Sequence, residues 1–300
     1  MNIKIIIRKV FHRISIFKNK FLNKQKFQKE LSDNLSSNFI DLLNFSYNSV
    51  LSRKDIDLGN KIESFRLSVA DEYKDKGLST YASPRSGSKL VDNHGKIIPG
   101  SFVESKKGGF ARTGTGIKTG IQLKKIAESL RAQSVVELGT NTGLSGCYFL
   151  SSNDNPFLYT IEGSSDLCKI AEANLSKISK NFHVDNGMFD DVIDSLNQRN
   201  KKFDLAFVDG QHEEQATLHY AQKLKSILNP GGAILFDDIF WSEGMNSAWN
   251  KVASDSDFSM TLDIGTRGLC ILKEDDKKIK KIKFELTNFT GKPLYNREGW

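Results

Sequence analysis

Residues 135–145 read VVELGTNTGLS and constrain the fold of this chain more than any other stretch. The β-branched valines that open the stretch are typical of a buried strand. Gly139 and Gly143 remove side chains where the backbone must turn sharply or come close to a ligand. A helix that starts near Leu144 would point its free N–H groups at the same place. We therefore predict a strand, a glycine turn and a helix that together hold a nucleotide-like ligand.

The spacing of this turn differs from that of the usual dinucleotide-binding loop. Counting from Gly139, Asn141 and Leu144 stand where the GxGxxG fingerprint needs its second and third glycines. The pattern Glu137-x-Gly139-x-x-x-Gly143 resembles motif I of class I S-adenosylmethionine-dependent methyltransferases, whose loop holds the methionine end of the cofactor. The resemblance implies S-adenosyl-L-methionine as the cofactor. It also implies a set of loop contacts: Glu137, Gly139, Thr140, Asn141, Gly143 and Ser145.

A second apolar run, residues 157–162 (FLYTIE), ends in an acid about twenty residues after the glycine loop. An acid at the tip of this strand can accept both ribose hydroxyls of a nucleoside, so we predict Glu162 as the ribose ligand. Taken alone, each of these features, the glycine turn or the acid that ends a strand, could equally belong to an ordinary strand-to-helix turn. Several pieces in order, at the ends of successive strands, favour a cofactor site.

A third short strand near residues 182–185 is followed by residues 186–190 (NGMFD). The family that this chain resembles places an adenine-contacting loop at this point. The resemblance implies that Met188 and Phe189 sandwich the ring and that Gly187 belongs to the loop. It further implies that Asp190 accepts a hydrogen bond from the adenine amino group.

Acidic residues end the next two predicted strands. Residues 203–209 (FDLAFVD) end in Asp209, and residues 232–238 (GAILFDD) end in Asp237 and Asp238. Parallel neighbours lie about 4.8 Å apart and their carboxyl ends share one edge, so the three carboxylates should converge. Because carboxylates repel one another, a hard divalent cation such as Mg²⁺ is the simplest partner. Alternatively, Asp237 and Asp238 could cap a helix at a loop instead of binding a metal.

Over residues 134–272 the resemblance sharpens to catechol O-methyltransferase-like enzymes and to small-molecule and sugar O-methyltransferases that carry VDGxH. Catechol-type enzymes hold their metal with an Asp and an Asp-Asn pair, matched here by Asp209, Asp237 and Asp238. The resemblance also implies Asp209 in cofactor binding and catalysis. Two positions depart from the pattern: Asp238 replaces the Asn of the family, and His212 replaces its catalytic Lys. These departures leave a catechol substrate unsupported.

Together these features predict an enzyme that methylates a hydroxyl of a small molecule, such as a sugar or a natural product. A metal would lower the pKa of the hydroxyl, and His212 would take its proton. The alternative for His212 is a first-turn helix residue without a catalytic role.

Two other functions share parts of this pattern. An NAD-dependent oxidoreductase would need a tighter glycine fingerprint and a catalytic Tyr-Lys or His-Asp set, which we do not find. A non-catalytic binding module on the methyltransferase fold would not need three converging acids.

Positive charge is concentrated at the start of the chain. The whole sequence has 43 Lys and Arg, 36 Asp and Glu, and a formal net charge of +7. Residues 1–30 hold nine of the cations and one acid, Glu30, so they contribute +8 and the remainder −1. A nucleic-acid enzyme would need a positive face at its active site, because phosphate neutralisation supplies most of the affinity. We therefore expect a small-molecule substrate and no nucleic-acid partner.

The basic segment also has a helical pattern. Its apolar residues recur every three or four positions and share one helical face: Ile3, Ile7, Val10, Ile14, Phe17 and Phe21. Residues 1–24 therefore favour contact with an anionic membrane surface or with a partner. A helix packed on its neighbour with a solvated basic face is the alternative. Three cysteines without zinc or disulfide spacing, and no run of about 18 apolar residues, predict a cytoplasmic enzyme, peripheral to a membrane if the arm binds lipid.

The chain divides into two predicted parts. Residues 1–116 form a helical N-terminal extension with the basic arm and, over residues 81–116, a Gly/Ser-rich lid-like loop. Residues 117–300 form the class I methyltransferase domain. Strands alternate with helices there, and residues 258–262 and 268–272 pair as a C-terminal antiparallel hairpin. The predicted fold is α/β, a Rossmann-like, doubly wound, mostly parallel sheet of seven strands.

Overall fold

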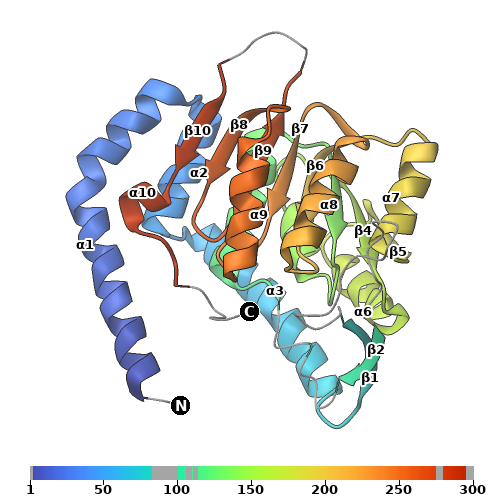
Figure 1. Ribbon diagram of the computed structural model, residues 1–300. Helices are drawn as coiled ribbons and strands as arrows, with labels where there is room; N and C mark the ends of the chain where they lie inside the picture. The colour runs from blue at the N-terminus through green and yellow to red at the C-terminus, as the bar shows by residue number, and fades with distance from the viewer. Residues whose placement is uncertain (1–2, 83–100, 106–109, 111–113, 275–279, 295–300) are drawn as a thin grey trace.

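One twisted sheet of eight strands runs through the protein in the computed structural model (Figure 1). The structure describes residues 3–82, 101–105, 110, 114–274 and 280–294. The strand order is β10-β8-β9-β7-β6-β3-β4-β5, and every neighbouring pair is parallel except the two pairs that β9 makes. The strands are β3 Ser134–Leu138, β4 Phe157–Glu162, β5 Phe182–Asn186, β6 Phe203–Val208, β7 Leu228–Phe236, β8 Phe258–Asp263, β9 Gly268–Leu272 and β10 Ile282–Glu285.

The predicted fold class and the C-terminal hairpin are confirmed, since β8 and β9 pair antiparallel beside a parallel sheet. The predicted number of strands is wrong, because β10 adds an eighth strand alongside β8. Its four residues, IKFE, do alternate between the two sides, and Phe284 is buried. The strand was missed because it is very short and lies in a lysine-rich stretch.

Helices cover both faces of the sheet. On one face lie α4 Ile117–Leu130, α5 Leu144–Leu150 and α6 Ser165–Leu175. On the other lie α7 Phe189–Gln198, α8 Glu214–Lys225 and α9 Glu243–Ser254. Successive residues of a strand point to opposite faces, so Val135 packs into one core and Val136 into the other. Burial on both faces explains why these strands are apolar throughout rather than alternating.

The N-terminal helices are α1 Ile3–Asn34, α2 Ser37–Asn48 and α3 Arg53–Glu72. Helix α2 packs on α4, and the C-terminal half of α1 packs through the buried Phe27 and Leu31. Phe27 stacks on Tyr47 of α2 and meets the edge of Phe289 in α10, Thr287–Thr290. These helices therefore share a core with the sheet. Within the described residues, none of the helices has the length and apolarity needed to traverse a lipid bilayer.

Part of the segment predicted as a lid-like loop is regular structure. Strands β1 Leu78–Ala82 and β2 Ser101–Ser105 form an antiparallel ribbon beside α6. The rest of that prediction, over residues 83–100, 106–109 and 111–113, lies outside the described residues.

Candidate active site

The glycine turn after β3 needs a residue without a side chain for two reasons. Gly139 has a φ of 105°, in the region that L-residues rarely adopt. A Cβ atom at this position would also lie 2.4 Å from the carbonyl oxygen of Asp209, at the end of β6. The close approach of these two strand ends brings the loop and the β6 acid together.

Glu162, at the end of β4, ties the glycine loop to the neighbouring strand. Its Oε2 accepts the backbone N–H of Asn141 at 2.9 Å, and its Oε1 accepts the backbone N–H of Ser164 at 2.9 Å. Burial raises the pKa of Glu162, although these hydrogen bonds act to lower it. Its side chain therefore holds the loop at the edge where the predicted ribose contact would lie.

Glu137 and its neighbours lie inside the protein. Glu137 is fully buried, and it accepts hydrogen bonds from Ser145 Oγ at 2.5 Å and Thr160 Oγ1 at 2.7 Å. The pKa of Glu137 is raised to about 7, mainly by burial, while the two hydroxyls act to lower it. Thr140 is 1% exposed and contacts the same Thr160 hydroxyl. The structure gives these side chains a supporting position beneath the turn, whereas the sequence predicted direct cofactor contacts.

The predicted adenine loop follows β5 and opens α7. Met188 is the N-cap residue of α7 and is half-buried. The ring of Phe189 lies 5.6 Å from that of Tyr220, measured between centroids. A Cβ atom at Gly210 would come within 2.8 Å of the Phe189 ring. Phe189 therefore packs against the end of β6, and this contact brings the predicted adenine loop close to the glycine turn.

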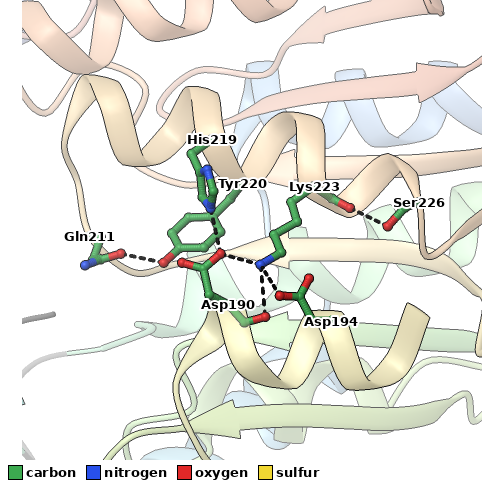
Figure 2. Close-up of polar contacts among 7 residues, drawn as sticks. All are labelled: Asp190, Asp194, Gln211, His219, Tyr220, Lys223 and Ser226. Atoms are coloured by element: carbon green, nitrogen blue, oxygen red, sulfur yellow. Dashed lines mark hydrogen bonds and ion pairs between the residues drawn. The ribbon is translucent and has the colours of Figure 1, made fainter. Parts of the chain in front are cut away.

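Asp190 forms polar contacts with two residues of α8 (Figure 2). Its Oδ1 atom lies 2.6 Å from His219 Nε2 and 2.5 Å from Lys223 Nζ. Burial acts to raise the pKa of Asp190, but the hydrogen bonds from His219 and Lys223 hold it below its usual value. Lys223 also pairs with Asp194 at 3.0 Å, so the cluster fastens α7 to α8. The sequence predicted an adenine contact for Asp190, and the pairing with His219 and Lys223 was not foreseen.

The acids at the ends of β6 and β7 meet around one histidine. His212 Nε2 lies 3.6 Å from Asp209 Oδ1 and 3.4 Å from Asp238 Oδ2. All three side chains are partly open to solvent, with 23–30% of each exposed. Trp241 stands edge-on to the imidazole, with 5.9 Å between ring centroids. The structure therefore brings together His212 and two of the three predicted acids beside an aromatic wall.

Negative charge is only partly balanced at this cluster, because the charge of Arg267 lowers the pKa values of Asp209 and Asp238 by less than burial and the neighbouring acids raise them. Burial raises the pKa of Asp209 well above its usual value, and the charges of Asp237 and Asp238 raise it further. The pKa of Asp238 is raised to about 6 by burial and by Asp237. A cationic group, whether an imidazolium or a metal ion, would relieve this repulsion.

Asp237, the third predicted acid, pairs with an arginine that the sequence analysis did not identify. Arg267, in the turn between β8 and β9, places its Nε atom 3.0 Å from Asp237 Oδ1. Arg267 is 5% exposed and donates from Nη1 to Gln122 Oε1 at 2.7 Å. Gln122 in turn donates to Ser46 of α2. The only sequence signal was an arginine between two apolar strands, and no spacing rule connects it to an acid thirty residues earlier.

The fit to a metal ion differs among the three predicted ligands. Across the described portion of the chain, no group of three or more His, Cys, Asp or Glu side chains is arranged to hold a metal. Asp237 fits poorly, because Arg267 already neutralises it. Asp209 and Asp238 fit better, because they offer hard oxygen ligands whose pKa values stay raised even though the charge of Arg267 acts to lower them.

The fold places the glycine turn and the strand-end acids, which resemble those of class I methyltransferases, at one edge of a mostly parallel sheet. Residues 136–239 match the family model described as a methyltransferase domain. The matched stretch starts within β3 and ends just after β7, so it contains the glycine turn, Glu162, the adenine loop and the acids around His212. This stretch, about a third of the chain, is therefore similar to a methyltransferase domain, in agreement with the class predicted from the sequence.

Solved structures with the same fold include cofactor-bound Rv0187 from MTB. It is 16% identical with a TM-score of 0.51, over 71% of this chain and 90% of that one. An O-methyltransferase from Bacillus cereus in complex with SAH is 18% identical, with a TM-score of 0.47, over 53% and 83% of the two chains. The O-methyltransferase TomG from Streptomyces achromogenes, in complex with SAM, is 19% identical, with a TM-score of 0.45, over 53% and 82%. No curated protein sequence matches the chain.

Proposed function

We propose that this protein is an S-adenosylmethionine-dependent O-methyltransferase that acts on a hydroxyl of a small molecule. The observation that carries the proposal is the methyltransferase-domain match over residues 136–239, because it encloses every predicted cofactor and catalytic residue. The near neutrality of the chain after residue 30 supports a small acceptor over a nucleic acid. The same match favours a methyltransferase over an NAD-dependent oxidoreductase.

In the proposed reaction, the acceptor oxygen attacks the methyl carbon of the sulfonium in line with the breaking S–C bond. An O–C bond forms, S-adenosylhomocysteine leaves, and the hydroxyl proton passes to His212. Asp209 and Asp238 lie within 3.6 Å of the imidazole and would stabilise the positive charge that it gains. Trp241 would form one wall for the acceptor and help to keep it aligned.

The oxygens of Asp209 and Asp238 would hold a divalent cation such as Mg²⁺. When bound, such an ion lowers the pKa of a coordinated hydroxyl and fixes its direction. His212 keeps its role as proton acceptor in either case.

The first test is calorimetric titration of the full chain with S-adenosylhomocysteine and, separately, with NAD, each in Mg²⁺ and in EDTA. We expect the homocysteine compound to bind and NAD not to bind. Glu162→Gln should weaken binding by about 10- to 100-fold, the cost of losing hydrogen bonds to a charged acceptor. The exposed Glu172→Gln is the matched control and should bind as the wild type does.

Catalysis is tested by an acceptor screen that measures S-adenosylhomocysteine release. His212→Ala should lower turnover by about 10²- to 10⁴-fold, as expected for loss of a general base, and leave cofactor affinity within about twofold. His183→Ala, at an exposed position on the edge strand β5, should keep full turnover. Unchanged turnover in His212→Ala would remove this residue from the mechanism, and binding of NAD instead of the homocysteine compound would overturn the proposed function.

A further inference from the structure

Helix α1 packs on the protein with one face and exposes an apolar face on the opposite side. The packed face carries Phe27 and Leu31, both buried, and Asn23, which donates to the Phe289 carbonyl oxygen. Half-buried Ile16 continues the packed face toward the N-terminus. In Figure 1 the C-terminal half of α1 lies against α10 and α2, and its N-terminal end points away from the sheet.

The exposed face is apolar over four turns. Seven of the eleven large hydrophobic side chains that are exposed in the described part of the chain belong to α1: Ile7, Val10, Phe11, Ile14, Phe17, Phe21 and Leu22. Phe17 and Phe21 are 74% and 77% exposed. At about 100° per residue, the seven side chains span an arc of about 140° on the helix surface. An exposed apolar face of this size indicates an interaction surface.

Cations border this apolar face on one side and interrupt it at one position. Arg13 and Lys24 border it on one side, and Lys18 lies within it, all exposed. Before Glu30 the helix contains no acid. Long basic side chains beside an apolar stripe can extend to phosphate groups while the stripe enters the acyl boundary.

A second copy of the chain is a poorer occupant of the same face. The spacing of Ile7, Val10, Ile14, Phe17 and Phe21 would suit a coiled-coil seam. In such a pair, however, Arg13 and Lys18 of one copy would flank the seam opposite the same cations of the other. The helix has no acid before Glu30 to pair with them, so the two copies would repel.

We propose that α1 is a membrane-surface anchor that lies in the plane of an anionic bilayer. Its apolar face, Ile7 to Leu22, would enter the interface, and its flanking Lys and Arg side chains would contact lipid phosphates. The packed face, around Phe27 and Leu31, keeps the enzyme attached to the anchor. The charge pattern favours an anionic surface over a neutral one.

The test is co-sedimentation of the full chain with vesicles of phosphatidylcholine alone and with about 30% phosphatidylserine added. We expect binding to the anionic vesicles, and at least tenfold weaker binding at about 1 M salt than at about 0.1 M, because salt screens the lipid charge. The triple variant Ile14→Gln, Phe17→Gln and Phe21→Gln should lose at least about tenfold in vesicle affinity. Since all three positions are exposed, its thermal stability should match the wild type.

The matched control is Val50→Gln with Leu67→Gln, which removes apolar groups of 72% and 62% exposure away from α1 and should bind vesicles normally. The variant Arg13→Gln, Lys18→Gln and Lys24→Gln should weaken binding at low salt only. Failure to bind anionic vesicles, or equal binding to neutral ones, would overturn the proposal. Concentration-dependent dimerisation that the apolar triple variant abolishes, without vesicle binding, would assign the face to a second copy.

Discussion

At the scale of single residues, the site depends on buried polar side chains whose partners come from distant parts of the sequence. Glu137 is held by Ser145 and Thr160, and Asp237 by Arg267. Burying a charge is costly unless it is paired, and the two acids meet this requirement differently. Asp237 has a cation, whereas Glu137 accepts hydrogen bonds from two hydroxyls, and burial raises its pKa to about 7 despite them.

Glu137 should make the stability of the cofactor-free protein depend on pH. Its ordinary pKa of 4.5 rises to about 7 on folding, so the folded state binds more protons between these values. The free energy of unfolding should therefore fall as pH rises from 4.5 to 7, by about 3 kcal/mol at 1.36 kcal/mol per pKa unit. As pH rises across this window, the free energy of unfolding of Glu137→Gln should increase relative to that of the wild type, because glutamine does not titrate. Urea unfolding at several pH values measures this difference.

The control for this prediction is Glu172→Gln, an exposed glutamate on α6. Its unfolding free energy should follow the wild-type pH profile. A wild-type-like profile in Glu137→Gln would mean that Glu137 does not titrate in this range.

At the scale of elements, the β3–α5 turn shows how local geometry assembles a site. The turn is positioned by Glu162 from β4 and by the backbone of Asp209 from β6. Gly139 lies between these contacts, with positive φ and no room for a side chain. The predicted cofactor edge is therefore a junction of three parallel strands rather than a property of the loop alone.

Gly139→Ala should destabilise the protein and weaken S-adenosylhomocysteine binding by more than about tenfold, because a Cβ would collide with the Asp209 carbonyl oxygen. Gly265→Ala is a matched control, since Gly265 has nearly the same φ, 103°, with nothing within 4 Å of the added atom. It should cost only about 1–2 kcal/mol, the strain of the left-handed backbone. Thermal unfolding and calorimetry measure both effects, and equal losses in the two variants would rule out the collision.

At the scale of the whole molecule, the N-terminal helices are part of the main core. Phe27 of α1 is fully buried and stacks on Tyr47 with 4.1 Å between ring centroids. It belongs to the same cluster as Leu205 in the middle of the sheet. The attachment of α1 therefore depends on a few aromatic contacts in its C-terminal half.

Phe27→Ala should lower the free energy of unfolding by about 3–5 kcal/mol, or release α1 from the protein, because it empties a buried aromatic position. Phe17→Ala, on the same helix but 74% exposed, should change stability by less than about 0.5 kcal/mol. Urea unfolding together with hydrogen exchange of α1 distinguishes global from local loss. Similar effects in both variants would contradict the assignment of packed and exposed faces.

Much of the fold could be predicted from local patterns. The strands over residues 134–138, 157–162, 203–208 and 268–272 were predicted nearly to the residue, because apolar runs bounded by turn residues carry their own signal. The short strand β10 and the β1–β2 ribbon were not predicted. Each is stabilised mainly by pairing with a distant partner, which a local pattern does not contain.

The sequence by itself determined the chemistry at the strand ends: a glycine turn, an acid that ends β4, acids after β6 and β7, and His212 near them. Only the tertiary structure decided how those groups pair. In the folded chain Asp237 pairs with Arg267, and Asp190 pairs with His219 and Lys223. Glu137 is buried, and the apolar stripe of α1 is exposed to solvent. The reason is physical, since backbone pattern is local, whereas charge pairing and burial depend on which distant segments the packed core brings within a few ångströms.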